Sequence, residues 1–163
     1  MLGQNIAFGI LALVMGVSAL RVVTAKNVVH AALYLVLVLS GVAGIFILLA
    51  AEFLAIVQIL VYIGAIVVLF LFGILLTRAP IGRSNELDND QRWAGVLVGL
   101  GLFGLLGAIL YNGFGRTKIP ENEVARSGDV GLAIFQTYVI PFEVISVLLL
   151  AALVGAVVIA RRD

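Results

Sequence analysis

Five long stretches of the sequence contain no Asp, Glu, Lys or Arg, and their lengths constrain the fold more than any other feature. They are 20, 25, 25, 23 and 17 residues long and cover residues 1–20, 27–51, 53–77, 93–115 and 144–160. A helix that rises about 1.5 Å per residue needs about 20 residues to cross about 30 Å of hydrocarbon, so four stretches qualify outright. The last one also qualifies if its helix begins near Tyr138 and carries Glu143 in its first turn. A β-barrel is not expected, because runs such as 66–72 are apolar on every face.

We therefore predict an all-α polytopic membrane protein with a single membrane domain over residues 1–163. Seven of the ten Lys and Arg residues fall on one side of such a membrane and three on the other. Because cytoplasmic loops retain basic residues, the N-terminus is expected outside and the C-terminus in the cytoplasm. The predicted elements are helices at about 2–22, 28–50, 53–77, 93–112 and 138–160, a cytoplasmic loop at 78–92 and an outer loop at 113–137.

Composition excludes several classes of function. The chain is 63% hydrophobic and 12% charged, which is too little charge to cover a water-facing surface. Its net charge of +1 argues against nucleic-acid binding. With no cysteine and one histidine, disulfides, iron–sulfur clusters, thiolate zinc sites and a bis-histidine haem are not expected. The sequence thus predicts no metal, no cofactor and no catalytic residue in this chain itself.

The third predicted span contains an unusual polar pair. Gln58 and Tyr62 are four residues apart, so they share one face of an α-helix. In the simpler interpretation they bond to adjacent helices, which contributes about 0.6 to 2 kcal/mol per pair. Gly64 weakens the helix locally by roughly 0.5–1 kcal/mol relative to alanine. Since a polar face beside a weak point also suits a π-bulge or hinge, packing and hinge both remain open.

Two carboxylates, Glu52 and Glu143, lie at the predicted outer ends of the third and fifth helices. An ionisable group inside a membrane is a functional candidate by default. The positive end of a helix dipole also favours a carboxylate, and Pro141 near N1 with Glu143 near N3 fits a helix start. Helix capping and function therefore both remain open for the pair.

The only histidine, His30, lies near the predicted cytoplasmic start of the second helix. It is explained more simply as an interfacial residue than as a metal ligand or proton relay. Because Arg21 and Lys26 lie on the same side of the membrane, a lipid-headgroup contact is plausible at this end.

The third span, EFLAIVQILVYIGAIVVLF at 52–70, resembles the NuoJ-type membrane subunit of proton-pumping respiratory complex I, NADH:quinone oxidoreductase. NVVHAALY at 27–34 is similar to the opening of that family's second helix, and YVIPFEVISVLLL at 138–150 to its fifth. The resemblance covers essentially the whole chain, which would correspond to mitochondrial subunit 6. It implies a subunit without a redox centre, in a complex whose NADH, FMN, iron–sulfur clusters and quinone are bound by other subunits.

The resemblance also implies partners and a mechanism. The implied partners, besides the lipid bilayer, are the quinone-site subunit, the small three-helix subunit, the small carboxylate-bearing subunit and an antiporter-like subunit. The third helix of the family carries a π-bulge that can revert to regular helix, which would move residues toward or away from a water path. The implied gate and proton-path candidates are Tyr62, Gly64, Gln58, Leu69, Glu52 and Glu143. Family members vary between Gln and Glu at the position of Gln58, so a titrating role does not follow here.

Three other interpretations remain open. The chain could be the equivalent subunit of a related ferredoxin- or coenzyme-linked quinone reductase. It could be a self-contained small transporter, although such a protein is expected to place charges or broken helices at the bilayer midplane. It could also be an assembly scaffold. The expected location is a bacterial plasma membrane, which the chain crosses several times.

Overall fold

The computed structural model describes residues 2–76, 91–115 and 126–161, with only the backbone of Arg92. Within these ranges all regular structure is helical, as predicted. Five helices are long and apolar enough to span a membrane: Leu2–Thr24, Val28–Leu48, Glu52–Leu76, Trp93–Phe114 and Val139–Ala160. The elements are α1 (Leu2–Thr24), α2 (Val28–Leu48), α3 (Glu52–Val57), η1 (Gln58–Val67), α4 (Val68–Leu76), α5 (Arg92–Phe114), α6 (Ser127–Leu132), η3 (Ala133–Thr137) and α7 (Val139–Ala160).

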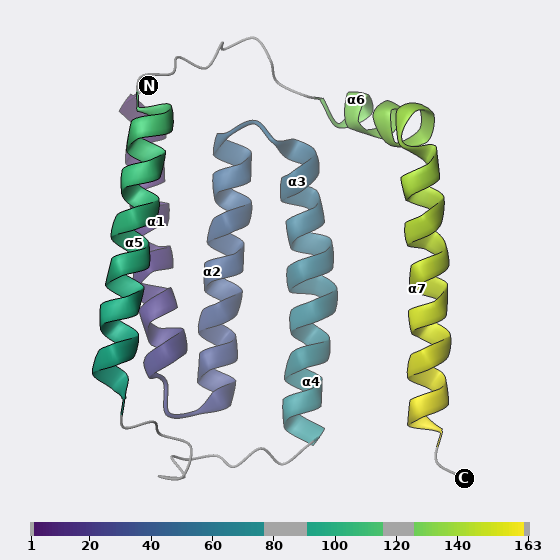
Figure 1. Cartoon of the computed structure of the whole chain (residues 1–163), viewed down its shortest axis with the longest axis horizontal. Coiled ribbons are helices and arrows are strands. Elements are labelled where there is room, and N and C mark those ends of the chain that lie inside the picture. The colour runs from purple at the N-terminus through teal and green to yellow at the C-terminus, as the bar shows by residue number, and fades with distance from the viewer. Residues whose placement is uncertain (1, 77–90, 116–125, 162–163) are drawn as a thin grey trace.

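Helix α2 is the centre of the packed part of the chain. It contacts α1 on one side, and on the other it contacts α3, η1 and α4, which together form the third span (Figure 1). Among the described elements, α5 packs against no other helix, and α7 contacts only η3. The two termini lie at opposite ends of the helices, as an odd number of spans requires (Figure 1). Which end is cytoplasmic remains a prediction from the basic residues.

Small residues allow α1 and α2 to approach closely. A Cβ atom added to Gly41 would overlap the side chain of Met15, and one added to Gly44 would lie 3.1 Å from Leu11 Cδ1. Ala43, also on α2, is buried. Close backbone approach drives helix association in lipid, where burying apolar side chains gives no hydrophobic advantage.

The turn between the second and third spans is a Schellman motif. The amide of Ala50 donates to the carbonyl of Ile47 at 3.0 Å, and the amide of Ala51 donates to that of Phe46 at 2.9 Å. Ala50 has a φ of 55°, the left-handed conformation that such a motif requires. The turn fixes where α3 begins relative to α2.

The structure corrects the predicted outer loop at 113–137. Helix α5 continues to Phe114, and the described part of the segment forms α6 and η3. The amide of Arg126 donates to the carboxylate of Asp129 at 3.3 Å, which caps α6, and α6 contacts α3. The rings of Phe135 and Phe142 meet edge to face at 5.1 Å across the corner into α7. The segment contains Gly128 and Gly131, but the cap by Asp129 and the apolar side chains after it support a helix. Most of the predicted cytoplasmic loop, 78–92, lies outside the described residues.

Candidate functional site

The middle of the third span is a π-helix. Element η1 covers ten residues, Gln58–Val67, and is continuous with α3 before it and α4 after it. The predicted π element in the third helix is therefore confirmed, and it is longer than a single bulge around Tyr62 and Gly64. Helices with i→i+5 hydrogen bonds are rare and are frequent at functional sites.

The π-helix determines which residues face α2. Gln58 at its start and Val67 at its end are both buried, with 7% and 2% of their surface exposed. An α-helix turns by about 100° per residue, so the nine steps from Gln58 to Val67 would turn it by about 900°, which is two and a half turns. The two side chains would then point in opposite directions. The wider π-helical turn brings both into the packed interior of the chain.

Gln58 packs between the third span and α2. Its side-chain amide Nε2 donates to the carbonyl oxygen of Leu39 at 3.4 Å. This distance is long for an N–H···O hydrogen bond, whose usual range ends near 3.2 Å, so the bond is weak. For Gln58, the structure supports the interpretation that its amide bonds to an adjacent helix.

Gln58 and Tyr62 do not share a face, which corrects the prediction from their spacing. Tyr62 is 47% exposed, whereas Gln58 is buried. Ile63, five residues after Gln58, is half-buried, so the covered side of the π-helix passes through Ile63. No feature of the sequence distinguishes Ile63 or Val67, because their neighbours are equally apolar.

The side chains of Tyr62 and Leu69 lie on surface that α2 does not cover. The hydroxyl of Tyr62 has no hydrogen-bond partner within the described ranges. Leu69, on α4, is 72% exposed. Both side chains are available to lipid, to water or to a neighbouring subunit.

Gly64 is the only glycine in the π-helix Gln58–Val67. A Cβ atom added there would lie 3.3 Å from the carbonyl oxygen of Ile59, five residues earlier in the same helix. Such a contact is closer than ordinary van der Waals separation, so one of the two groups would have to move. The lack of a side chain at Gly64 therefore avoids this contact in the i→i+5 arrangement.

The two glutamates occupy different settings. Glu52 is the first residue of α3, where the positive end of the helix dipole favours a carboxylate, as predicted. Glu143 is the fifth residue of α7, which begins at Val139, so the predicted place near N3 is wrong. Its helix does not contact α3, η1 or α4 within the described part of the chain. The structure therefore places Glu52 in the same span as the π-helix and does not bring Glu143 to it.

The third span combines the amide of Gln58, the exposed phenol of Tyr62 and a helix in which the direction of the side chains depends on the backbone hydrogen-bond pattern. Neither the amide nor the apolar side chains around it can exchange a proton. The segment can orient water and hydrogen-bond to neighbours, and a change of helix type would change which side chains do so.

Comparison with known proteins gives a consistent result. A family model described as NADH-ubiquinone/plastoquinone oxidoreductase chain 6 matches residues 18–159. F(420)H(2) dehydrogenase subunit J of Methanosarcina mazei is 43% identical, over 98% of this chain and 92% of its own length. NAD(P)H-quinone oxidoreductase chain 6 of Leptolyngbya boryana is 40% identical and that of Synechocystis sp. 39% identical, each over 98% of this chain. The alignments cover 81% and 82% of those two relatives.

Proposed function

The chain belongs to the NADH-ubiquinone/plastoquinone oxidoreductase chain 6 family, and from this premise we propose that it couples quinone reduction to proton translocation through its π-helical segment. Family membership implies assembly into a multi-subunit quinone oxidoreductase. NADH, FMN, iron–sulfur clusters and quinone would then be bound by other subunits, and this chain would contribute a gate. Its five apolar helices make it a multi-pass membrane protein.

The observation that carries the proposal is that η1 differs by about half a turn from a regular α-helix over the same residues. A π-helix holds extra residues in each turn compared with an α-helix. Removing one of these extra residues from the turn rotates the following helix by about 100° relative to the preceding one. The start of α3 is held by the Schellman turn after α2. A change toward α-helix would therefore rotate α4 and move Leu69 to a different environment.

Such a rotation can control water without a titratable group. Leu69 is a large apolar side chain, and moving it into or out of a narrow path would interrupt or admit a chain of water molecules. Tyr62, whose hydroxyl is exposed, could bond to that water in one state. An element with two discrete packings is what a switch between hydrated and dry states needs. Glu52, at the end of the same span, and Glu143 are proposed as polar groups along the path.

The exposed helix surfaces support a set of neighbours. Helices α5 and α7 leave most of their apolar side chains uncovered. We propose that neighbouring complex I subunits and lipid cover them: the quinone-site subunit, the small three-helix subunit, the small carboxylate-bearing subunit and an antiporter-like subunit. Cross-linking of the assembled complex would test each pair.

The substitution Gly64→Val in the assembled complex tests the gate. A branched side chain beside the Ile59 carbonyl disfavours the π-helix, so we expect impaired pumping or slow transitions between resting and active states. Electron-donor oxidation by the peripheral arm should remain largely intact. Normal assembly together with normal pumping would exclude the gate. Loss of the whole complex in Gly64→Val and also in the smaller change Gly64→Ala would favour an assembly scaffold.

The electron donor has a second candidate. A relative named F(420)H(2) dehydrogenase subunit J is 43% identical to the chain, which supports a coenzyme-linked quinone reductase as the alternative complex. Nothing in this chain would touch the donor in either case. The peripheral subunits that co-purify in mild detergent, identified by mass spectrometry, would distinguish the two.

The cellular membrane is a separate proposal. The relatives include chloroplast proteins, and we propose a bacterial plasma membrane for this chain. Fractionation of the source cells, followed by detection of the chain in the membrane fraction, would test it.

A further inference from the structure

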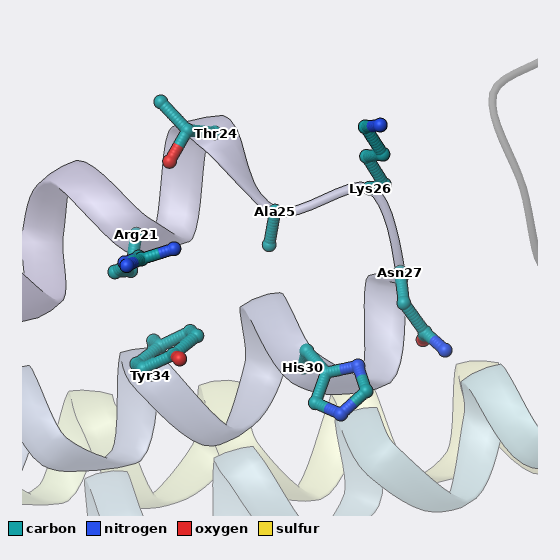
Figure 2. Close-up of a pocket in the computed structure, with 7 residues that line it drawn as sticks. All are labelled: Arg21, Thr24, Ala25, Lys26, Asn27, His30 and Tyr34. Atoms are coloured by element: carbon teal, nitrogen blue, oxygen red, sulfur yellow. The ribbon is translucent and has the colours of Figure 1, made fainter.

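A cavity of about 350 Å³ opens between the facing ends of α1 and α2. It is lined by the last turn of α1, the connecting residues and the first two turns of α2 (Figure 2). Figure 2 shows Arg21 of α1 facing Tyr34 of α2, with His30 one turn before Tyr34. The volume lies within the range of about 300 to 1,000 Å³ that is usual for small-ligand sites.

The cavity has a positive charge that no described residue neutralises. Arg21 and Lys26 both line it, and neither forms an ion pair with any described residue. The first 51 residues of the chain contain no Asp or Glu. Helix α2 also begins here, so the positive end of its dipole lies at the same place.

The connecting residues are held in place without using the basic side chains. The carboxamide of Asn27 accepts a hydrogen bond from the amide of Val29 at 2.8 Å, which caps α2. The hydroxyl of Thr24 donates to the carbonyl of Leu20 at 2.7 Å. Among the described residues, none occupies the guanidinium of Arg21, the ammonium of Lys26 or the hydroxyl of Tyr34, so these three groups are the donors that the cavity offers.

A phosphate group suits these donors. A guanidinium can give two parallel hydrogen bonds to phosphate oxygens, and an ammonium adds a point charge. The helix surfaces beside the cavity are apolar and exposed, with Leu20 and Val23 on α1 and Leu33 on α2. A soluble phosphate would leave this surface unused, whereas the acyl chains of a lipid would cover it.

We propose that this cavity binds the phosphate of an anionic phospholipid, with Arg21 and Lys26 as its main contacts and Tyr34 as a further donor. The acyl chains lie along the exposed apolar surface of α1 and α2. The site is far along the chain from the π-helix and does not depend on the proposed gate. It would fix the end of the α1–α2 pair at the membrane surface.

The test uses the whole complex that contains this chain, reconstituted into phosphatidylcholine vesicles. The probe is phosphatidylglycerol with a photoactivatable group near its phosphate, and mass spectrometry maps the label. We expect label on peptides from residues 21–34. A basic residue near the membrane surface contributes about fivefold in affinity, so the double variant Arg21→Gln/Lys26→Gln should lose about thirtyfold. If that variant does not assemble, Lys26→Gln alone should lose about fivefold, since Lys26 lies in the connection between helices.

A matched control separates a site from general surface charge. Arg161→Gln removes a basic residue at the end of α7, on the same side of the molecule and outside the cavity. It should leave the label on residues 21–34 unchanged. An equal loss in Arg161→Gln, or full labelling of the assembled Lys26→Gln variant, would overturn the proposal. Competition by a large excess of inorganic phosphate, as effective as competition by unlabelled phosphatidylglycerol, would assign the site to a soluble anion and overturn the lipid.

Discussion

The substitution Gly64→Ala should shift the third span away from the π-helix by a small and calculable amount. The added Cβ lies 3.3 Å from the Ile59 carbonyl oxygen, so the backbone or the carbonyl must move by a few tenths of an ångström. Helix propensity favours alanine in both helix types, so only this contact distinguishes them. Taking the lower end of overpacking costs, about 1 kcal/mol, the ratio of π-helix to α-helix falls about fivefold.

Gly73→Ala is the matched control for this experiment. Gly73 lies in α4 of the same span, and a Cβ added there would meet no atom within 4 Å. The substitution adds the same methyl group and the same helix propensity in a regular α-helix. Because the added methyl group meets nothing beyond the neighbouring turns of its own helix, we expect Gly73→Ala to leave both assembly and coupling unchanged.

The assay measures two rates on the assembled complex in sealed vesicles: quinone reduction and proton translocation. If coupling depends on the π-helix, Gly64→Ala should lower the ratio of protons moved to electrons transferred, or slow activation, relative to Gly73→Ala. A structure of the variant should show more regular α-helix between Gln58 and Val67. Identical coupling in the two variants, with η1 unchanged in Gly64→Ala, would refute the reasoning.

Three further predictions concern packing. Gly41→Leu should destabilise the α1–α2 pair by about 1–3 kcal/mol because its Cβ overlaps Met15, whereas Gly16→Leu, with open space around it, should not; thermal denaturation in detergent compares them. Ala50→Gly should raise the denaturation temperature, since removing Cβ at a φ of 55° relieves about 1 kcal/mol. Gln58→Leu should cost less than about 1 kcal/mol in chemical denaturation, because the bond it removes is long; a larger loss would mean that the amide has a stronger partner.

The membrane spans were predictable because placing a charged side chain in hydrocarbon has a high free-energy cost. The lengths of the uncharged stretches located four helices outright and a fifth once Glu143 was included in it, and the structure has five within its described residues. The resemblance of residues 52–70 to a known family predicted a π element in the third span. The short helices before α7 were missed, although Asp129 provides a carboxylate that caps the first of them.

Which side chains of the third span are buried against α2 could not be predicted from the sequence. Periodicity identifies a buried face only when polar and apolar residues alternate with the turn of the helix. Val67 is buried, while Ile66 and Val68 on either side of it are half exposed, and the three side chains have nearly the same chemistry. Only the hydrogen-bond pattern of the backbone separates them. For the same reason, the predicted pairing of Gln58 with Tyr62 failed.

The free-energy cost of moving a side chain from the packed interior into lipid decides which half of the third span would rotate. A change from π-helix to α-helix must take either Gln58 or Val67 out of its buried position, since an α-helix cannot point both the same way. Moving Val67 from protein to lipid costs little, because lipid is as apolar as the packed interior. Moving the amide of Gln58 into lipid leaves its polar atoms without partners, at a cost of several kcal/mol. The rotation therefore falls on α4, and a second state should retain the contact between Gln58 and Leu39 and turn Val67 outward. A second state that kept Val67 buried and released Gln58 would contradict this assignment.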